Sequence, residues 1–165
     1  MICSEKQGME ERTMFELLKK LTGTFGVSGN EEDIREVIKS EIAECVDNVY
    51  VDPLGNLIAV KKGTEKKIML AAHMDEIGVM ATFIDEKGFI RFANVGWVSQ
   101  YYALGQRVKF RNGTVGAVFY EEKLEDMKNL KLSKMYIDIG AKSREDAEKK
   151  VRIGDTACFV GDAVQ

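Results

Sequence analysis

The sequence has few cysteines that could cross-link a fold, and it lacks the long apolar run of a membrane-spanning helix. Its three cysteines, Cys3, Cys45 and Cys158, are odd in number and far apart, without the close pairs of zinc ribbons and redox motifs. It contains no apolar run of the roughly eighteen residues that a membrane helix needs, and no apolar stretch of a signal peptide at its start. We therefore expect a cytoplasmic protein that does not bind membranes.

An excess of positive charge is also absent. The 165 residues include 27 acidic and 24 basic side chains, which give a net charge of -3 and no overall positive field to attract phosphate backbones. We therefore expect no nucleic-acid partner. Hydrophobic residues make up 45% and charged residues 31%, values typical of a folded globular protein with room for one domain, or for part of a domain and a small module.

The first part of the chain carries the pattern of two helices. Met1–Arg12 is polar and without pattern, so we expect a flexible extension over residues 1–12. Thr13 with Glu16, and Ser28 with Glu31, have the spacing of capping boxes at helix starts. Apolar residues at helical spacing follow each box: Met14, Leu17, Leu18 and Leu21, then Ile34, Val37, Ile38 and Ile42.

Strands are predicted after the second helix. Val49–Val51 and Leu57–Val60 flank a turn rich in Asp, Pro, Gly and Asn, which is typical of a hairpin-like pair. The continuous apolar run Ile68–Ala72 predicts a strand covered on both faces, and it ends at His73. Helices followed by strands, one of them buried, favour a layered α/β unit over residues 13–78.

From Val79 onward the pattern is that of a second, β-rich module over residues 79–165. Short β-like stretches are separated by turn residues, and the pair Asn112–Gly113 suits a tight hairpin, so we expect antiparallel strands. A short helix capped by Ser143 interrupts them. The predicted strands are Val79–Ile84, Phe89–Phe92, Arg107–Phe110, Val115–Phe119 and Tyr136–Ile139, and the segment Ile153–Val160 closes the module.

His73 is the one histidine of the chain, and a lone histidine is more often a hydrogen-bonded structural residue than a ligand. Its predicted place at the carboxyl end of a buried strand favours a ligand, because open α/β sheets bind ligands at that edge. Asp75, two residues on, can orient the imidazole as carboxylates beside metal sites do. The pair is half of a site, since a closed zinc site takes about four ligands.

Three ordered motifs resemble one family. Gly26–Glu32, Val51–Leu57 and Ala71–Gly78 are similar to segments of the dinuclear-metal aminopeptidases that assemble into tetrahedral dodecamers. That family includes glutamyl and deblocking aminopeptidases, and many members carry the label cellulase or endo-1,4-beta-glucanase. The resemblance covers nearly everything after Thr13 and continues through Ile137–Ala141, Ser143–Glu145 and Val151–Asp155.

The resemblance implies a site with two divalent metal ions, zinc or cobalt, that removes N-terminal residues from peptide substrates. His73 is expected to be the metal ligand and Asp75 the catalytic residue that orients the site. Residues 13–78 would be the N-terminal part of the catalytic domain, and residues 79–165 an inserted β-barrel-like module for dimerisation and assembly. The remaining ligands and the general base belong, in the family, to a part that follows this module.

From this resemblance we expect the chain alone to bind metal weakly at most, to be inactive by itself, and to form homo-oligomers or associate with complete subunits. A non-catalytic assembly or regulatory subunit is the alternative. An endoglucanase is a weaker one: Trp97, Tyr101 and Tyr102 could stack on sugars, but the carboxylate pair that glycosidases need is not recognisable.

Overall fold

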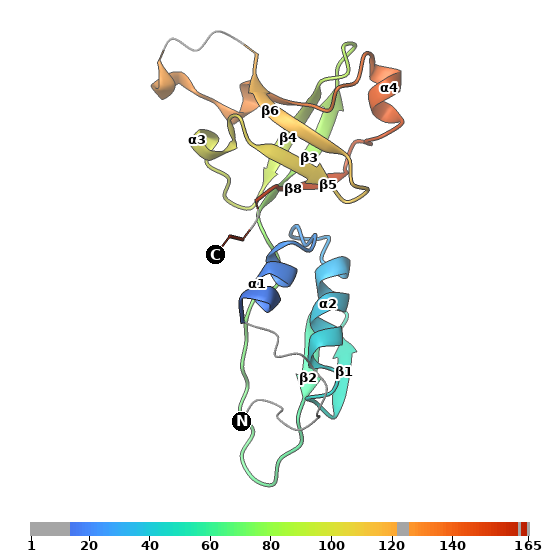
Figure 1. Cartoon of the computed structure of the whole chain (residues 1–165), viewed down its shortest axis with the longest axis vertical. Coiled ribbons are helices and arrows are strands. Elements are labelled where there is room, and N and C mark those ends of the chain that lie inside the picture. The colour runs from blue at the N-terminus through green and yellow to red at the C-terminus, as the bar shows by residue number, and fades with distance from the viewer. Residues whose placement is uncertain (1–13, 122–125, 162, 165) are drawn as a thin grey trace. The chain divides into compact units, whose positions relative to one another are not determined.

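The computed structural model describes residues 14–121, 126–161 and 163–164, which form two compact units (Figure 1). The first unit contains the chain up to Gly26, residues Glu31–Met74 and the C-terminal end. The second contains Val27–Asn30 and Asp75–Gly161. The extension expected over residues 1–12, and Thr13 of the first capping box, lie outside the described residues.

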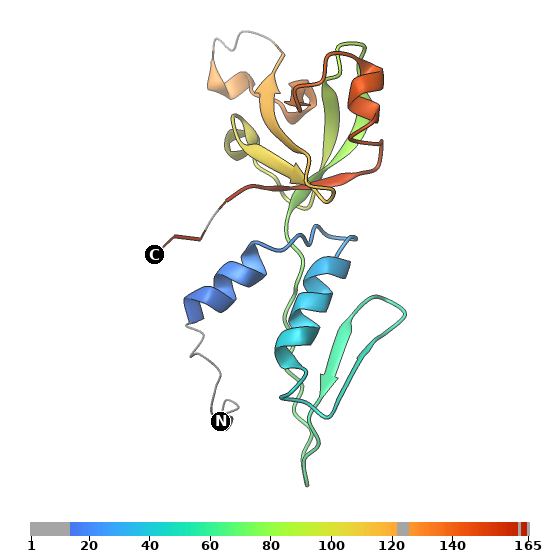
Figure 2. The ribbon, with the colours of Figure 1, turned by 45° about the vertical axis from the view of Figure 1, so that its right-hand side comes forward.

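The first unit is a small α/β assembly of two helices and one hairpin. Its elements are α1 (Met14–Thr22), α2 (Glu32–Ile42), β1 (Asn48–Val51) and β2 (Leu57–Val60). The strands form the hairpin that the sequence predicts, and they pair antiparallel with Val49 opposite Ala59. Figure 2 shows α2 alongside this hairpin. Lys20 Nζ of α1 donates to Glu41 Oε1 of α2 at 2.6 Å, which ties the two helices together.

The predicted capping box at the start of α2 is wrong. The helix begins at Glu32, and the residue before it, Glu31, makes no side-chain capping hydrogen bond. Ser28 cannot cap a helix that follows it directly, because Gly29 has a φ of 84°, outside the helical region. The hydroxyl of Ser28 is therefore available for a different partner.

The predicted buried strand at Ile68–Ala72 is also wrong. Residues 61–75 contain no strand, and Ile68, Met69 and Leu70 are 86%, 88% and 93% exposed. A strand exists only where a neighbour accepts its backbone hydrogen bonds. No strand of the described residues pairs with this segment, so the apolar run that predicts burial lies uncovered.

The second unit is a closed antiparallel barrel of six strands in the order β3-β4-β7-β6-β5-β8 (Figure 1). The ring closes because the last strand pairs with both β3 and β5. The antiparallel β-barrel-like module predicted for this region is thereby confirmed. Its strands are β3 (Gly78–Ile84), β4 (Ile90–Val95), β5 (Arg107–Phe110), β6 (Val115–Tyr120), β7 (Met135–Asp138) and β8 (Thr156–Phe159).

Short helices connect the barrel strands. They are α3 (Gln100–Ala103), the 3-10 turns η1 (Met127–Asn129) and η2 (Leu132–Lys134), and α4 (Arg144–Glu148). The predicted cap of α4 is confirmed, since Ser143 Oγ accepts from the amide of Asp146 at 3.3 Å. No helix among the described residues is long and apolar enough to cross a membrane.

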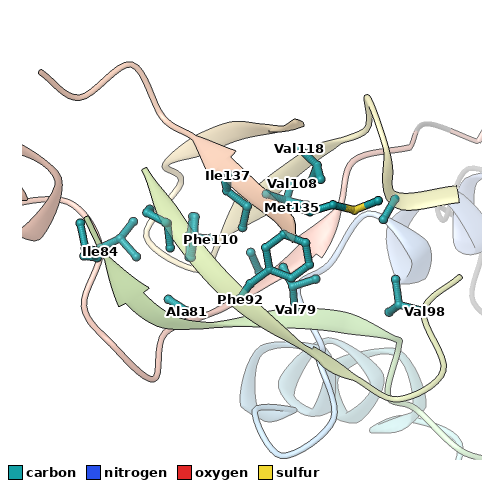
Figure 3. Packing of buried hydrophobic residues seen from close by; sticks show 14 of the residues in the cluster. Val79, Ala81, Ile84, Phe92, Val98, Val108, Phe110, Val118, Met135 and Ile137 are labelled. Carbon is teal, nitrogen blue, oxygen red and sulfur yellow. The ribbon is translucent and has the colours of Figure 1, made fainter. Parts of the chain in front are cut away.

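The barrel interior is the main hydrophobic core (Figure 3). Alternate residues of each strand point inward, as on β5, where Val108 and Phe110 are buried while Arg107 and Lys109 are exposed. Figure 3 shows Phe110 of β5, Phe92 of β4, and Met135 and Ile137 of β7 among the packed side chains. The module thus has a core of its own.

Asp52 organises the turn of the β1–β2 hairpin and makes it sensitive to acid. Its Oδ1 accepts from the amides of Leu54 and Asn56, both at 2.9 Å, and its Oδ2 accepts from Asn56 Nδ2 at 2.9 Å. These bonds, the side-chain bond from Asn56 first, lower the pKa of Asp52 below the ordinary 3.8. A lowered folded-state pKa means that the stabilisation is complete above 3.8 and is lost as the pH falls through the lower value.

We expect the hairpin turn to loosen in acid only below a pH of about 4. Amide exchange at Leu54 and Asn56, followed by NMR from neutral to strongly acid pH, measures this. Asp52→Asn keeps the shape of the side chain but cannot titrate, so its turn should show no matching step. A step of equal size in the asparagine variant would contradict the assignment.

Candidate functional site

His73, the predicted metal ligand, lies in the first unit. It follows the extended segment described above, and its side chain is exposed rather than seated at the end of a buried strand. Exposure leaves an imidazole accessible to a metal ion from solution. Within the described part of the chain, no edge of a buried sheet positions this histidine.

Asp75, the predicted orienting residue, begins the main stretch of the second unit and is half-buried. Its Oδ2 accepts a short hydrogen bond from the hydroxyl of Ser28, 47 residues earlier. The backbone beside the pair is joined as well, because the amide of Ser28 donates to the carbonyl of Glu76 at 3.2 Å. Two motifs that are far apart in the sequence therefore meet at this carboxylate.

Val27, Ser28 and Asn30 hold the loop Val27–Asn30 against the barrel. Val27 is fully buried and forms a parallel bridge with Glu76. Asn30 closes a turn by donating its amide to the carbonyl of Val27 at 2.8 Å. Its side chain donates to Thr156 Oγ1 at 3.0 Å and accepts from Arg111 at 3.2 Å. The loop is thus fixed by backbone, apolar and side-chain contacts at once.

Gly78 makes this close approach possible. A Cβ atom at this position would stand 2.6 Å from the carbonyl oxygen of Ala157 and 2.8 Å from a methyl carbon of Val27. Only glycine leaves room for the loop and β8 to pack on the same point of β3. The glycine that ends the motif Ala71–Gly78 is therefore explained by packing.

Cys158 lies on β8 opposite Gly78 and can be excluded as a nucleophile at neutral pH. Burial, and then the negative charge of Glu76, raise the pKa of its thiol to about 11. Since the thiolate is the reactive form, the side chain stays protonated and inert near pH 7. Its role is to fill space in the wall of the barrel.

An open cavity of about 460 Å³ lies beside the Val27–Asn30 loop. Asn30 and Thr156, which anchor the loop, also line the cavity, so the anchoring bonds form part of its wall. Its full lining is Asn30, Phe110, Arg111, Asn112, Gly154, Asp155 and Thr156.

The described residues do not complete a metal centre. Within residues 14–121, 126–161 and 163–164, no three histidine, cysteine, aspartate or glutamate side chains lie close enough together to hold a metal ion. The imidazole of His73 can occupy one coordination position of a divalent zinc-like ion. A closed site requires about three further ligands.

The sequence pattern predicts the wrong role for Ser28, that of a helix cap. Serine three residues before glutamate fits a capping box, and the partner that it has in the structure, Asp75, is distant in the sequence. The signal that could have identified it was its place inside Gly26–Glu32, one of the three motifs of the family resemblance.

Comparisons with known proteins agree with these features. A sequence model described as M42 glutamyl aminopeptidase matches residues 55–165. A curated relative from Acetivibrio thermocellus, whose proposed activity is that of an aminopeptidase, is 75% identical over 156 residues. The match covers 94% of this chain and 47% of the relative, so the chain spans about half the length of that protein.

Two solved structures carry the same fold over most of the chain. The TET1 peptidase of Pyrococcus horikoshii, which can assemble into a tetrahedron or a large octahedral shell, is 38% identical with a TM-score of 0.80. The match covers 89% of this chain and 46% of the peptidase. A Thermotoga maritima protein described as an endoglucanase is 39% identical with a TM-score of 0.81, covering 90% of this chain and 46% of its own.

Proposed function

The chain belongs to the M42 glutamyl aminopeptidase family, and from this premise we propose that it supplies the first metal-ligand segment and the barrel module of a metal-dependent aminopeptidase. The observation that carries the proposal is the family match over residues 55–165, which includes both His73–Asp75 and the whole barrel. The reaction is the hydrolysis of N-terminal residues from peptides.

In this proposal His73 is a terminal ligand of one metal ion and Asp75 orients that ligand. When bound, a divalent metal pair polarises the scissile carbonyl and lowers the pKa of the attacking water. The metal is zinc or cobalt, and the remaining ligands and the general base come from polypeptide outside the described residues. The chain alone therefore binds metal weakly and does not hydrolyse peptides.

The proposed enzyme is a cytoplasmic homo-oligomer. The exposed apolar side chains of Ile68, Met69 and Leu70 support association, because such a run is stable in water only when another surface covers it. The Pyrococcus horikoshii peptidase can assemble into a tetrahedron or a large octahedral shell, which supports the same idea for this member of the family.

A second candidate is a non-catalytic subunit that joins complete subunits through the barrel. The lone histidine of the sequence favours it, because one imidazole cannot serve two metal ions. The barrel, with its own closed core, is the part that such a subunit would use.

A complementation experiment separates the two candidates. The chain is mixed with the half of the Acetivibrio thermocellus relative that it does not match, and both are assayed on aminoacyl substrates with zinc or cobalt. We expect no hydrolysis by the chain alone, and hydrolysis in the mixture that is lost with a chelator and in His73→Ala. A β-1,4-glucan is included as the substrate of the endoglucanase alternative.

A control variant and three possible outcomes distinguish the proposed functions. Ser40→Ala, on the exposed face of α2, should leave the complemented activity unchanged. Stoichiometric association without hydrolysis would favour the assembly subunit. Hydrolysis by the chain alone, abolished in His73→Ala, would contradict the proposal that ligands are missing from it.

A further inference from the structure

The outer surface of the barrel carries a row of side chains, most of them aromatic, across four neighbouring strands. Phe83 of β3 lies opposite Arg91 of β4, and Phe119 of β6 lies opposite Tyr136 of β7. Arg91 and Tyr136 are neighbours as well, because β4 pairs antiparallel with β7 and the guanidinium lies 5.9 Å from the centre of the Tyr136 ring. We call these four residues the aromatic row, and all of them belong to the second unit.

The aromatic row is unusual for the water-facing side of a barrel. Outward positions of an antiparallel sheet normally carry polar side chains, as Arg107 and Lys109 do on β5. In the row, by contrast, Phe83 is 49% exposed and Phe119 is 46% exposed. Adjacent apolar side chains left in water mark surfaces that contact another molecule. The closed ring of strands has no free edge for strand addition, so the barrel has to associate through an outer face such as this one.

The charges beside the row indicate what the other molecule is. Arg91 Nη2 lies 2.6 Å from Glu121 Oε2, and Arg144 Nη2 lies 2.9 Å from Glu86 Oε1. Arg144 also lies over the ring of Phe83, 5.3 Å from its centre. Each of these arginines is thus accompanied by a glutamate, so the face is complementary in charge to itself. A second copy of the chain fits this pattern, because a two-fold interface brings the same surface of both copies together.

The shape of the face agrees with the same partner. An open cavity of about 380 Å³ lies beside the row, and its wall includes Phe89, Arg91, Glu121 and Tyr136. The rings of Phe89 and Tyr136 are 4.5 Å apart, and the exposed ring of Phe119 lies 6.1 Å from that of Tyr136. A projecting ring and a recess therefore share one face. In a two-fold interface the ring of each copy can enter the recess of the other, as aromatic anchors do at the centre of protein interfaces.

We propose that the aromatic row is the surface through which two copies of this chain form a two-fold dimer. Phe119 is an anchor of the contact, and Arg91 of each copy pairs with Glu121 of the other. The proposal rests on the homo-oligomer of the proposed function and adds the surface that forms it. Removing an aromatic anchor from an interface commonly weakens association by about tenfold or more.

The first experiment is sedimentation of the whole chain over a range of concentrations, which measures the dimer dissociation constant. Phe119→Ser removes the anchor ring. Tyr50→Ser is the matched control, because Tyr50 is an aromatic residue with the same exposure, 46%, on β1 of the first unit. Leu70→Ser tests association through the exposed apolar run of the first unit instead. Backbone amide spectra verify that each variant is folded.

The second experiment reverses the charges of the face. Arg91→Glu places two carboxylates there and Glu121→Arg places two guanidinium groups, so like charges meet when either variant pairs with itself. In an equimolar mixture the two variants carry opposite charges, and we expect them to form a mixed dimer. An ion pair that only stabilises a single chain does not produce this rescue, because mixing repairs neither chain.

We expect Phe119→Ser to dimerise at least about tenfold more weakly than the unaltered chain, and Tyr50→Ser to be unchanged. A folded Phe119→Ser chain that dimerises normally, while Leu70→Ser dissociates, would overturn this inference and leave the proposed homo-oligomer intact. Charge-reversed variants that stay monomeric when mixed would also overturn it. A chain that is monomeric at every concentration would overturn the inference and the homo-oligomer together, whereas the complementation assay tests the proposed activity separately.

Discussion

Replacing Phe110 with alanine is expected to lower the free energy of unfolding of the barrel by about 3–5 kcal/mol. Phe110 is 1% exposed and is among the largest fully buried side chains. It projects from β5 into the interior, where Figure 3 shows it among residues of the other strands. The removed ring would leave a cavity that rigid strands cannot close, and folded domains have only about 5–15 kcal/mol of net stability.

Urea unfolding followed by circular dichroism measures this loss. Trp97→Ala is the matched control, because it removes another large aromatic side chain from the same unit but from a position that is 86% exposed. We expect the control to change stability by less than about 0.5 kcal/mol. Equal losses in the two variants would show that Phe110 is not part of a packed core.

Replacing Gly78 with alanine is expected to cost about 1–3 kcal/mol and to release the Val27–Asn30 loop. The added Cβ would stand 2.6 Å from the carbonyl oxygen of Ala157, which belongs to the backbone of β8 and cannot rotate away. It would also meet methyl carbons of Val27 at 2.8 and 2.9 Å. Either β8 or the Val27–Asn30 loop must then shift. Each of these elements contacts Asp75 or a residue close to it in the sequence.

The same urea measurement, with amide exchange at Ser28 and Asn30, tests this second result. Gly161→Ala is the control, because nothing lies within 4 Å of a Cβ at that position. We expect the control to leave the stability and the exchange of the loop nearly unchanged. Unchanged exchange at Ser28 and Asn30 in Gly78→Ala would mean that the loop does not depend on this glycine.

Elements whose signals are local were predicted well from the sequence. The hairpin β1–β2 and the strands of the barrel have apolar alternation and turn residues within a few positions, and the structure contains each of them. The cap of α4 is also local, since Ser143 and Asp146 are three residues apart. In these cases the pattern that predicts each element lies within the element or beside it, even though several barrel strands pair with strands distant in the sequence.

Prediction failed where the local pattern indicates one structure and contacts distant in the sequence impose another. The run Ile68–Ala72 has the composition of a buried strand. Composition indicates that the segment favours burial, but it does not specify which surface buries it. Ser28 has the local spacing of a cap, but Gly29 turns the backbone out of the helical region and Asp75 supplies the acceptor. The division of the chain into residues 13–78 and 79–165 stays a prediction, while the compact units show that four residues of the early motif belong with the barrel.

The sequence by itself indicated the class of the fold through its periodicity, and the family and the two residues proposed for the site through motifs that resemble those of known proteins. Only the tertiary structure decided that the barrel closes through β8, that His73 is exposed in the described part, and that Ser28 holds Asp75. The physical reason is that hydrogen bonds and burial depend on which groups meet in space, and the groups that meet at Asp75 are 47 residues apart.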